Sequence, residues 1–217
     1  MTLIIFCHPT KNSHCGKILS RVASALDHNK KQYELLDLYG INFDGYLKDI
    51  EYRRMVNRER LVEPDVEAAQ RKITAAKTLI FIYPTWWYNM PARLKGFIDR
   101  VFSSGFAYKF FRVPKILMFG ASIFSHIPGL RYFMQTHAVT PLLRGKKALV
   151  FRTYGGPASG KRIFGNTTAV LENNVLRFCG ITDITIHELF NTDKKEHASQ
   201  KYENAYLNKI EHICGRI

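Results

Sequence analysis

Cysteine is scarce in this sequence, and the patterns in which it usually acts are missing. The chain of 217 residues contains four cysteines, which form no Cys-x-x-Cys pair and none of the Cys/His spacings of a zinc site. Four cysteines are also too few for a disulfide framework in a chain of this length. We therefore expect reduced thiols, no metal site and a cytoplasmic protein.

Long apolar runs are also missing. The longest uncharged, mostly apolar stretch runs from Ile116 to Leu130, which is 15 residues, whereas a helix that crosses a bilayer needs about 20. Met1 leads straight into the apolar run Thr2–Cys7 with no charged segment before it, so no export signal is expected. The sequence predicts neither a membrane span nor secretion.

Acidic side chains are few. The 18 Asp and Glu residues face 32 Lys and Arg residues, a net charge of +14, which favours anionic partners such as nucleotide phosphates, acidic lipids or nucleic acids. The composition, 46% hydrophobic and 23% charged, excludes a disordered, collagen-like or coiled-coil chain. At about 150 residues per domain, we expect residues 1–217 to form a single domain.

Strand-like and helix-like segments alternate along the chain. Five short runs have the composition of β-strands: Thr2–Cys7, Tyr33–Leu38, Thr78–Tyr83, Lys147–Thr153 and Thr182–Leu189. Apolar residues at helical spacing follow in the segments 18–26, 66–76, 94–101, 171–178 and 206–210. Pro64 and Pro91 stand where a first helical residue is expected. The alternation predicts an α/β fold, a doubly wound parallel sheet with helices on both faces.

The composition of the five runs predicts their order in the sheet. Three runs are continuously apolar, as strands covered on both faces must be: Leu3–Phe6, Leu79–Tyr83 and Ala148–Phe151. The second run carries Glu34 and Asp37, and the fifth alternates polar and apolar residues, so both are expected at the edges. This favours the flavodoxin-like order 2-1-3-4-5 over the dinucleotide-binding order 3-2-1-4-5-6.

Two segments interrupt the alternation. Residues 49–63 are charged and predict either a solvated connection or a short helix. Ser103–Gly145 is an aromatic-rich insertion between the third helix and the fourth strand, and a loop of this length is usually functional or an interface. Within it, the apolar run Ile116–Phe124 lies among basic residues. We expect this run to pack in a subunit interface, and the alternative is contact with a membrane surface.

In an open parallel sheet the ligand binds at the carboxyl ends of the strands, so the loops there are candidates for the site. The first loop, from His8 to Gly16, leads into a helix near Ser13 or His14 and contains no acidic residue. Free N–H groups at a helix start bind anions, which predicts a phosphate site. The alternative is that Ser13 only caps the helix.

The loops after the third and fourth strands add flat and small residues. Pro84–Pro91 contains three successive aromatic residues, of which at least one is expected to flank a flat ligand or a partner subunit. Thr153–Gly160 contains paired glycines, which allow the backbone to approach a ligand closely. Together the three loops predict a site for a phosphorylated, planar cofactor.

These residues resemble a known family. The run from Tyr83 to Phe102, followed by Gly105-Phe-Ala-Tyr108, is similar to the signature of the NAD(P)H:quinone oxidoreductases of DT-diaphorase type, which are flavodoxin-like. Thr153-Tyr-Gly-Gly156, Arg177-Phe-Cys-Gly180 and the early His8-Pro also match, so the resemblance covers nearly the whole chain.

The resemblance implies a homodimeric flavoprotein that uses NAD(P)H to reduce quinones by ping-pong hydride transfer. It implies FAD, with FMN as the alternative, held by His8, Asn12, Ser13, His14 and Cys15 at the phosphates and by Pro84, Thr85, Trp86, Trp87, Tyr88, Thr153, Tyr154, Gly155 and Gly156 at the ring. Tyr108 corresponds to an aromatic residue that covers the partner's substrate pocket, and Phe110 takes the place of a second such tyrosine.

Two departures from the family pattern bear on function. The loop after Gly156 is shorter than in the mammalian members, and Lys161 or Arg162 is expected to stabilise anionic flavin in place of their Tyr and His. The insertion is much longer than the mammalian counterpart, which leaves substrate shape open. It also supports a rival interpretation, a regulatory subunit that docks on a membrane transporter at the inner face of the membrane.

Two further motifs point to other functions but fail on single residues. Gly155-x-x-x-x-Gly160-Lys161 resembles a nucleotide-binding P-loop, but Arg162 stands where a Ser or Thr must bind Mg²⁺. Lys95-Gly-Phe-Ile begins like an RNA-recognition motif, but Asp99 stands where an aromatic residue is needed. We therefore expect no nucleic-acid partner.

Overall fold

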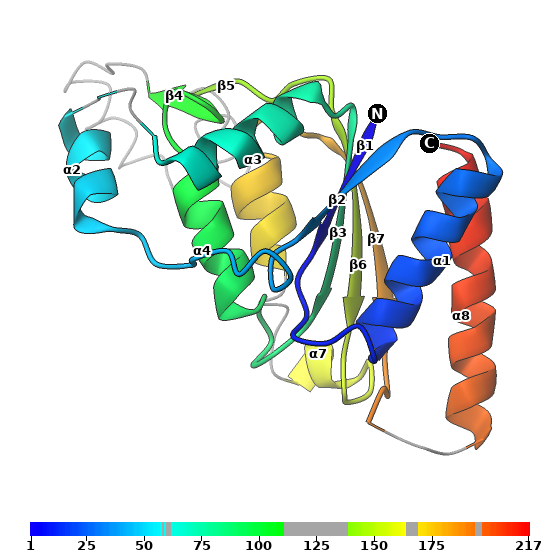
Figure 1. Ribbon diagram of the computed structural model, residues 1–217. Coiled ribbons are helices and arrows are strands. Elements are labelled where there is room, and N and C mark those ends of the chain that lie inside the picture. Colours follow the sequence, from blue (N-terminus) through cyan, green and yellow to red (C-terminus); the bar gives the residue numbers. More distant parts are fainter. Residues whose placement is uncertain (58, 60–61, 111–138, 164–168, 194–196) are drawn as a thin grey trace, which may run out of the picture.

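The computed structural model describes residues 1–217 except 58, 60–61, 111–138, 164–168 and 194–196. Its centre is a five-stranded parallel sheet with helices on both faces (Figure 1). The strands are β1 (Thr2–Phe6), β2 (Tyr33–Asp37), β3 (Thr78–Pro84), β6 (Lys147–Thr153) and β7 (Asp183–Leu189). Their order is β2-β1-β3-β6-β7, which confirms the predicted order 2-1-3-4-5.

Burial explains why the strands take these places. Every residue of β1 and β3 is buried, and so is every residue of β6 after Lys147. In β2 and β7 buried residues are a minority, so the polar side chains of both strands reach water at the edges. The prediction that the second and fifth strands lie at the edges is confirmed.

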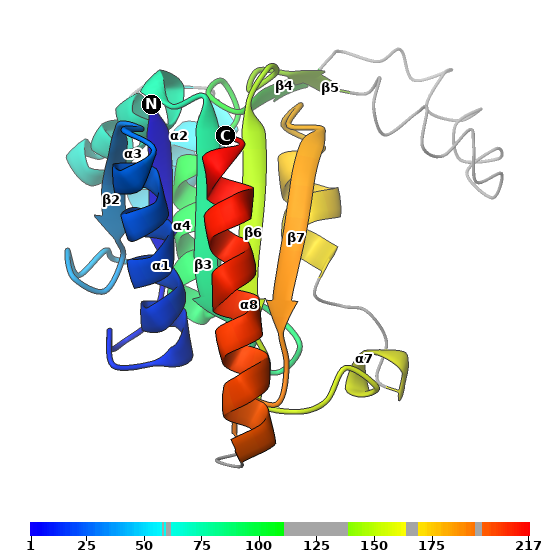
Figure 2. The same ribbon diagram turned by 90° about the vertical axis from the view of Figure 1, so that its right-hand side faces the viewer.

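Two layers of helices cover the sheet. Helices α1 (His14–His28) and α8 (His197–Gly215) lie side by side on one face (Figure 2). Helices α3 (Pro64–Ala75) and α4 (Ala92–Val101) and a π-helix (Val170–Leu176) cover the other face. Each layer closes a separate hydrophobic core against the sheet, because alternate residues of a strand point to opposite faces.

Some local expectations need correction. Residues 49–57 form helix α2 (Asp49–Asn57), so the short-helix alternative was right for this segment. Pro64 does begin α3, but Pro91 precedes the first residue of α4. A short helix α7 (Gly160–Ile163) follows β6.

The insertion begins and ends with two strands that the sequence did not predict. These are β4 (Tyr108–Phe110) and β5 (Val139–Pro141), which pair antiparallel. Residues 111–138 lie outside the described residues, and with them the run Ile116–Phe124, for which the sequence predicts packing in a subunit interface or contact with a membrane.

The described residues contain no helix long and apolar enough to cross a membrane. In the same part of the chain, no group of three or more His, Cys, Asp or Glu side chains is arranged to hold a metal ion. The four cysteines are free and buried.

Candidate active site at the carboxyl ends of the strands

A hollow of about 440 Å³ lies where the strands end, at the end of the sheet that carries α7 in Figure 1. The loops after β1, β3, β6 and β7 line it with His8, Ser13, His14, Cys15, Pro84, Thr85, Trp86, Trp87, Thr153, Gly155 and Thr192. All but Thr192 are residues that the sequence predicts for the cofactor. Four others, Asn12, Tyr88, Tyr154 and Gly156, lie in the same loops but do not line the hollow.

The loop after β1 is folded back on the start of α1. Ser13 caps the helix by accepting a hydrogen bond from the N–H of Gly16 at 3.1 Å, and its hydroxyl donates to the Thr10 carbonyl at 3.0 Å. At Gly16 a Cβ would lie 1.8 Å from the Lys11 carbonyl oxygen, so only glycine lets the loop approach this closely. The capping role of Ser13 is confirmed, and the first N–H groups of the helix remain available to an anion.

An acidic residue that the sequence did not suggest faces this loop. Glu203 of α8 is buried, and its carboxylate lies 2.6 Å from His14 Nδ1 and 3.0 Å from Lys17 Nζ. Burial alone would raise the pKa of Glu203, but the hydrogen bonds and charges of His14 and Lys17 lower it below its usual range. The cationic side chains of the loop are therefore partly neutralised. Anion binding at this loop depends more on the N–H groups at the start of α1 than the number of basic side chains in the sequence suggests.

Cys15 joins α1 to the sheet. Its Sγ lies 3.4 Å from the Thr153 hydroxyl, and burial raises the pKa of the thiol to about 12 against a smaller opposing effect of that contact. The thiol stays protonated at neutral pH, so Cys15 forms part of the wall as a small neutral group.

The loop after β3 contains a tight and unusual turn. Trp86 and Asn89 exchange two backbone hydrogen bonds of 3.0 Å, and the residues between them, Trp87 and Tyr88, have φ values of 50° and 55°. Positive φ at both central residues is the type I′ turn, which normally requires Asn-Gly. Bulky residues in this conformation cost of order 1–3 kcal/mol each, and such strain is found mainly at functional sites.

The side chain of Trp87 makes almost no packing contact that could offset this strain. It is 99% exposed, and Trp86 beside it is 44% exposed. The Thr85 N–H donates to the Thr153 carbonyl at 2.8 Å, which ties this loop to the loop after β6. The aromatic surface is thereby held beside the hollow.

Several polar groups at the hollow have no protein partner among the described residues. Thr85 Oγ1 is buried and unpaired, and the N–H groups of Trp87, Gly155 and Gly156 donate to no group in this part of the structure. Buried polar groups are nearly always hydrogen-bonded. The orphaned hydroxyl and the free N–H groups therefore fit a ligand with oxygen and nitrogen acceptors.

The glycine pair has no structural requirement of its own. A Cβ on Gly156 would meet nothing within 4 Å, and one on Gly155 would only touch the Asp193 side chain at 3.8 Å. Neither glycine has a positive φ. Open space in front of a bare backbone is what a planar ring needs for close approach, so these residues fit a flavin.

A buried cluster of charges supports the loop after β6 from behind. Arg152 is 2% exposed and contacts Glu172 at 2.6 Å and Glu188 at 2.8 Å. Glu188 also accepts hydrogen bonds of 2.8 Å from the Tyr154 hydroxyl and Lys161 Nζ. Burial alone would raise the pKa of Glu188, but these donors lower it.

The same cluster accounts for Lys161, which the sequence predicted as a stabiliser of anionic flavin. Lys161 is engaged by Glu188 and does not line the hollow, and the side chain of Arg162 lies outside the described part. Sequence reasoning missed Glu172, Glu188, Thr192 and Glu203. Of these, only Thr192 had a recognisable local pattern, because Asn191-Thr192 is a turn-like pair shortly after the end of β7.

Tyr108 and Phe110 are not part of this hollow. They lie on β4, near the opposite end of the sheet from α7 (Figure 1). Tyr108 packs edge-on against Phe178 and Phe110 with ring centroids 5.0 and 5.2 Å apart, and Phe110 is 65% exposed. The structure does not bring these two aromatic residues to the site of their own chain.

Comparison with known proteins agrees with this architecture. Residues 1–212 match the family described as having a flavodoxin-like fold. A protein of Haemophilus influenzae named as an uncharacterized NAD(P)H oxidoreductase is 30% identical over 192 residues, which cover 87% of this chain and 82% of that protein.

Two further relatives extend the comparison. NAD(P)H dehydrogenase [quinone] 1 of Cavia porcellus is 29% identical over 199 residues, and the match covers 82% of this chain but 64% of that longer protein. The crystal structure of Smu.1420 from Streptococcus mutans UA159 has a TM-score of 0.75 and 28% identity, with both chains covered completely. The chain belongs to the flavodoxin-like family, among the NAD(P)H oxidoreductases of DT-diaphorase type that its sequence resembles.

Proposed function

We propose that this protein is a flavin-dependent NAD(P)H oxidoreductase that reduces quinones or similar electrophiles by two electrons. The observation that carries the proposal is the hollow at the carboxyl ends of the strands, which is lined by the orphaned hydroxyl of Thr85 and by the bare backbone of Gly155, with Gly156 next to it in the same loop. Membership in a family of NAD(P)H oxidoreductases supports the same reaction class.

Each loop has its own task in this proposal. The start of α1, with Ser13 and His14, binds the phosphate of the flavin through helix N–H groups. The free N–H groups of Trp87, Gly155 and Gly156 donate to polar atoms of the ring. We expect FAD in preference to FMN as the bound flavin, because the sequence resembles the mammalian enzymes.

The chemistry that a bound flavin supplies is the acceptance of hydride from NAD(P)H and its later transfer to an acceptor. Trp86 and Trp87 shield the opening from water and offer flat surfaces against which both substrates stack. NAD(P)H and the acceptor use the same opening in turn, which is the ping-pong order. The proton that completes reduction of the acceptor comes from solvent, so the reaction needs no acidic or basic side chain in the hollow.

A homodimer is the active unit in this proposal. Tyr108 and Phe110 lie too far from their own hollow to cover it, so they act in that of a second copy. Exposed apolar side chains of the loop after β2, of α2 and of β4 support such an interface: Ile41, Tyr46, Tyr52, Val56 and Phe110. Large exposed apolar patches commonly mark protein–protein contacts.

The test is the absorption spectrum of the purified full-length chain, together with mass identification of the released cofactor. We expect the two visible flavin bands, which bleach when NAD(P)H is added without oxygen and return when a quinone follows. A colourless protein that takes up neither FAD nor FMN on reconstitution would overturn the proposal.

The dimer has a separate test. Because Phe110 is 65% exposed, Phe110→Asp should fold and bind flavin normally but sediment as a monomer and reduce quinone slowly. Ile163→Asp, at another exposed apolar residue, serves as the control. A wild-type protein that is monomeric and fully active would contradict the dimer.

The rival function, a regulatory subunit docked on a transporter, depends on the insertion. Residues 111–138 lie outside the described residues, so no contact there bears on it. It stays a prediction, and co-purification with a membrane protein would support it.

A further inference from the structure

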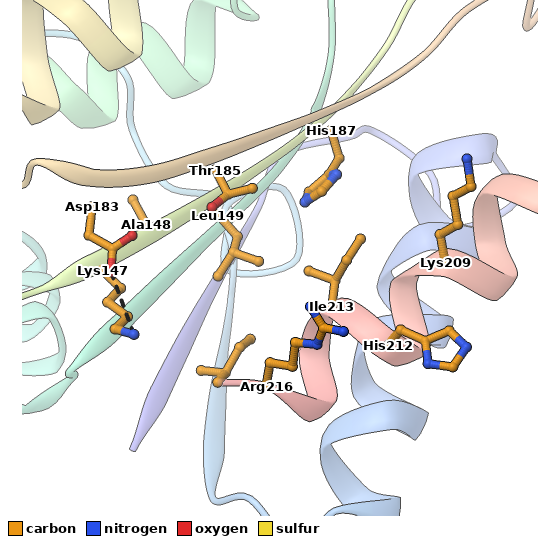
Figure 3. Close-up of a pocket in the computed structure, with 11 residues that line it drawn as sticks. Lys147, Ala148, Leu149, Asp183, Thr185, His187, Lys209, His212, Ile213 and Arg216 are labelled. Atoms are coloured by element: carbon orange, nitrogen blue, oxygen red, sulfur yellow. Dashed lines mark ion pairs between the residues drawn. The ribbon is translucent and has the colours of Figure 1, made fainter.

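A second cavity, of about 480 Å³, lies on the α1/α8 face of the sheet, away from the candidate active site. It is bounded by the first halves of β6 and β7 and by the last turns of α8, and it includes Lys147 and Asp183, the first residues of their strands. Figure 3 shows side chains from the strands and from α8 facing one another across it. It shares no lining residue with the candidate active site.

The arrangement of the helices explains why this cavity is open. Helix α8 packs beside α1 rather than over β7 (Figure 2), so the edge strand keeps an uncovered face. Thr185 on that face is exposed, and His187 is half-buried. The cavity is therefore a consequence of the fold and not of a missing side chain.

The walls of the cavity are apolar at the base and cationic on the side of α8. Apolar contact comes from Leu149 and Ile213, which are buried and half-buried. Lys209 of α8 and Arg216, which follows the last residue of α8, both line the rim, and neither makes an ion pair with any residue that the structure describes. In Figure 3 the Arg216 guanidinium lies beside Ile213, whereas the Lys209 ammonium points away from it. Asp183 is already engaged by Lys147 at 3.5 Å.

The wall of the cavity also contains an uncharged polar atom, a ring nitrogen of His187. His187 Nε2 is buried and has no hydrogen-bond partner among the described residues, while its ring stacks on Phe151 with centroids 5.1 Å apart. Burial lowers the pKa of His187, so the ring is neutral at pH 7. A buried nitrogen left without a partner is an exception that calls for a ligand or water.

We propose that this cavity binds a small organic anion with an apolar body, such as a medium-chain or aromatic carboxylate. The apolar body lies against Leu149 and Ile213, and the carboxylate meets Arg216 directly and Lys209 at longer range; neither charge has an ion-pair partner among the described residues. Ligand sites of this kind combine a mostly apolar wall with a few polar groups that fix orientation. The lining offers no Phe, Tyr or Trp ring to stack a base and no helix N-terminus for a phosphate chain, so a nucleotide fits less well.

The dipole of α8 explains part of the positive charge at the rim of the cavity without a ligand. Arg216 and His212 lie at the carboxyl end of α8, where basic residues compensate the helix dipole. That explanation predicts a loss of stability when the charge is removed, but no ligand. Lys209 lies farther from the helix end, and the effect of the dipole falls off within the last turn.

The test uses octanoate as the probe and backbone amide shifts in NMR spectra of the full chain as the readout. We expect saturable shifts at Thr185, His187 and Ile213 and none at Gly155 or Gly156. 1-Octanol, with the same apolar body and no charge, should bind at least fivefold more weakly, and inorganic phosphate should produce no saturable shifts at these amides.

Variants separate the contributions. Arg216→Gln and Lys209→Gln should each raise the Kd for octanoate about two- to fivefold, as expected for partly exposed charge pairs. Thr185→Trp, which fills the cavity from an exposed strand position, should raise it at least tenfold. Lys201→Gln removes a lysine of the same helix that does not line the cavity and should leave the Kd unchanged.

Three results would overturn the proposal. One is the absence of saturable shifts with octanoate, and another is equal binding of octanoate and 1-octanol. The third is an equal Kd for the wild type and for Arg216→Gln, Lys209→Gln and Thr185→Trp, which would leave the two cations as helix-end and surface charges only.

Discussion

The hydroxyl of Tyr154 donates a 2.8 Å hydrogen bond to Oε1 of Glu188, which fastens the loop after β6 to the edge strand β7. Two cations, Lys161 and Arg152, engage the same carboxylate. The ring of Tyr154 also stacks on Phe190 with centroids 4.6 Å apart. The glycine pair that follows Tyr154 is therefore presented to the hollow from a fixed base.

Replacing Glu188 should destabilise the fold. In Glu188→Gln the buried Arg152 loses one of the two carboxylates that it contacts among the described residues and keeps the other, Glu172, so the free energy of unfolding in urea should fall by about 1–3 kcal/mol. Glu67→Gln is the matched control, because its ion pair with Arg71 is exposed on both sides and should matter by less than about 1 kcal/mol. Equal effects of the two substitutions would show that the cluster does not support the loop.

The same carboxylate predicts a pH dependence. The folded protein holds the pKa of Glu188 below its usual range, so this contribution to stability is complete above the unfolded pKa, about 4.3. It is lost as the pH falls through the folded pKa. Urea unfolding between pH 7 and pH 3 should show the difference between wild type and Glu188→Gln shrinking below about pH 4. A constant difference would contradict the assignment.

Gly156→Val tests the bare backbone of the candidate site. Because a Cβ at this position meets no protein atom within 4 Å, the apo-protein should keep its melting temperature to within a few degrees. Flavin occupancy after reconstitution should fall at least tenfold, since the side chain enters the space of the ring. Ala158→Val, two residues farther along the same exposed loop, should bind flavin normally. Equal losses of stability and occupancy would make the glycine structural.

Trp87→Asn tests the strain in the turn after β3. Asparagine tolerates the left-handed conformation better than tryptophan, and the 99% exposed indole contributes no packing, so the apo-protein should gain about 0.5–1 kcal/mol. Quinone reduction should become several-fold slower because the aromatic surface is lost. Stability is read from urea unfolding and activity from steady-state turnover. A destabilised variant with unchanged turnover would show that the strained turn is not maintained for activity at the cost of stability.

Strand order could be predicted from the sequence because burial leaves a local pattern. Continuous apolar runs at Leu79–Tyr83 and Ala148–Phe151 require cover on both faces, whereas Glu34 in the second run requires water. The candidate loops could be predicted for a similar reason, since aromatic and glycine residues after a strand have few purely structural uses.

The partners of those loops could not be predicted. Glu203 faces His14 across 189 positions of sequence, and such a contact depends on how α8 packs beside α1 rather than on any local spacing. The position of Tyr108 away from the hollow of its own chain likewise depends on where α4 ends and β4 begins, which no local pattern indicates. Trp87 and Tyr88 have positive φ values, which bulky residues rarely adopt, so sequence propensities argue against the turn that the structure contains.

The burial of the four cysteines has a chemical consequence for an enzyme that handles quinones. Quinones are electrophiles that add thiolates, and only the thiolate form reacts. Burial raises the pKa of Cys7, Cys15, Cys179 and Cys214 to about 12 each, so almost none of these thiols ionises at pH 7. The protein is thereby protected against covalent arylation by the compounds it is proposed to reduce.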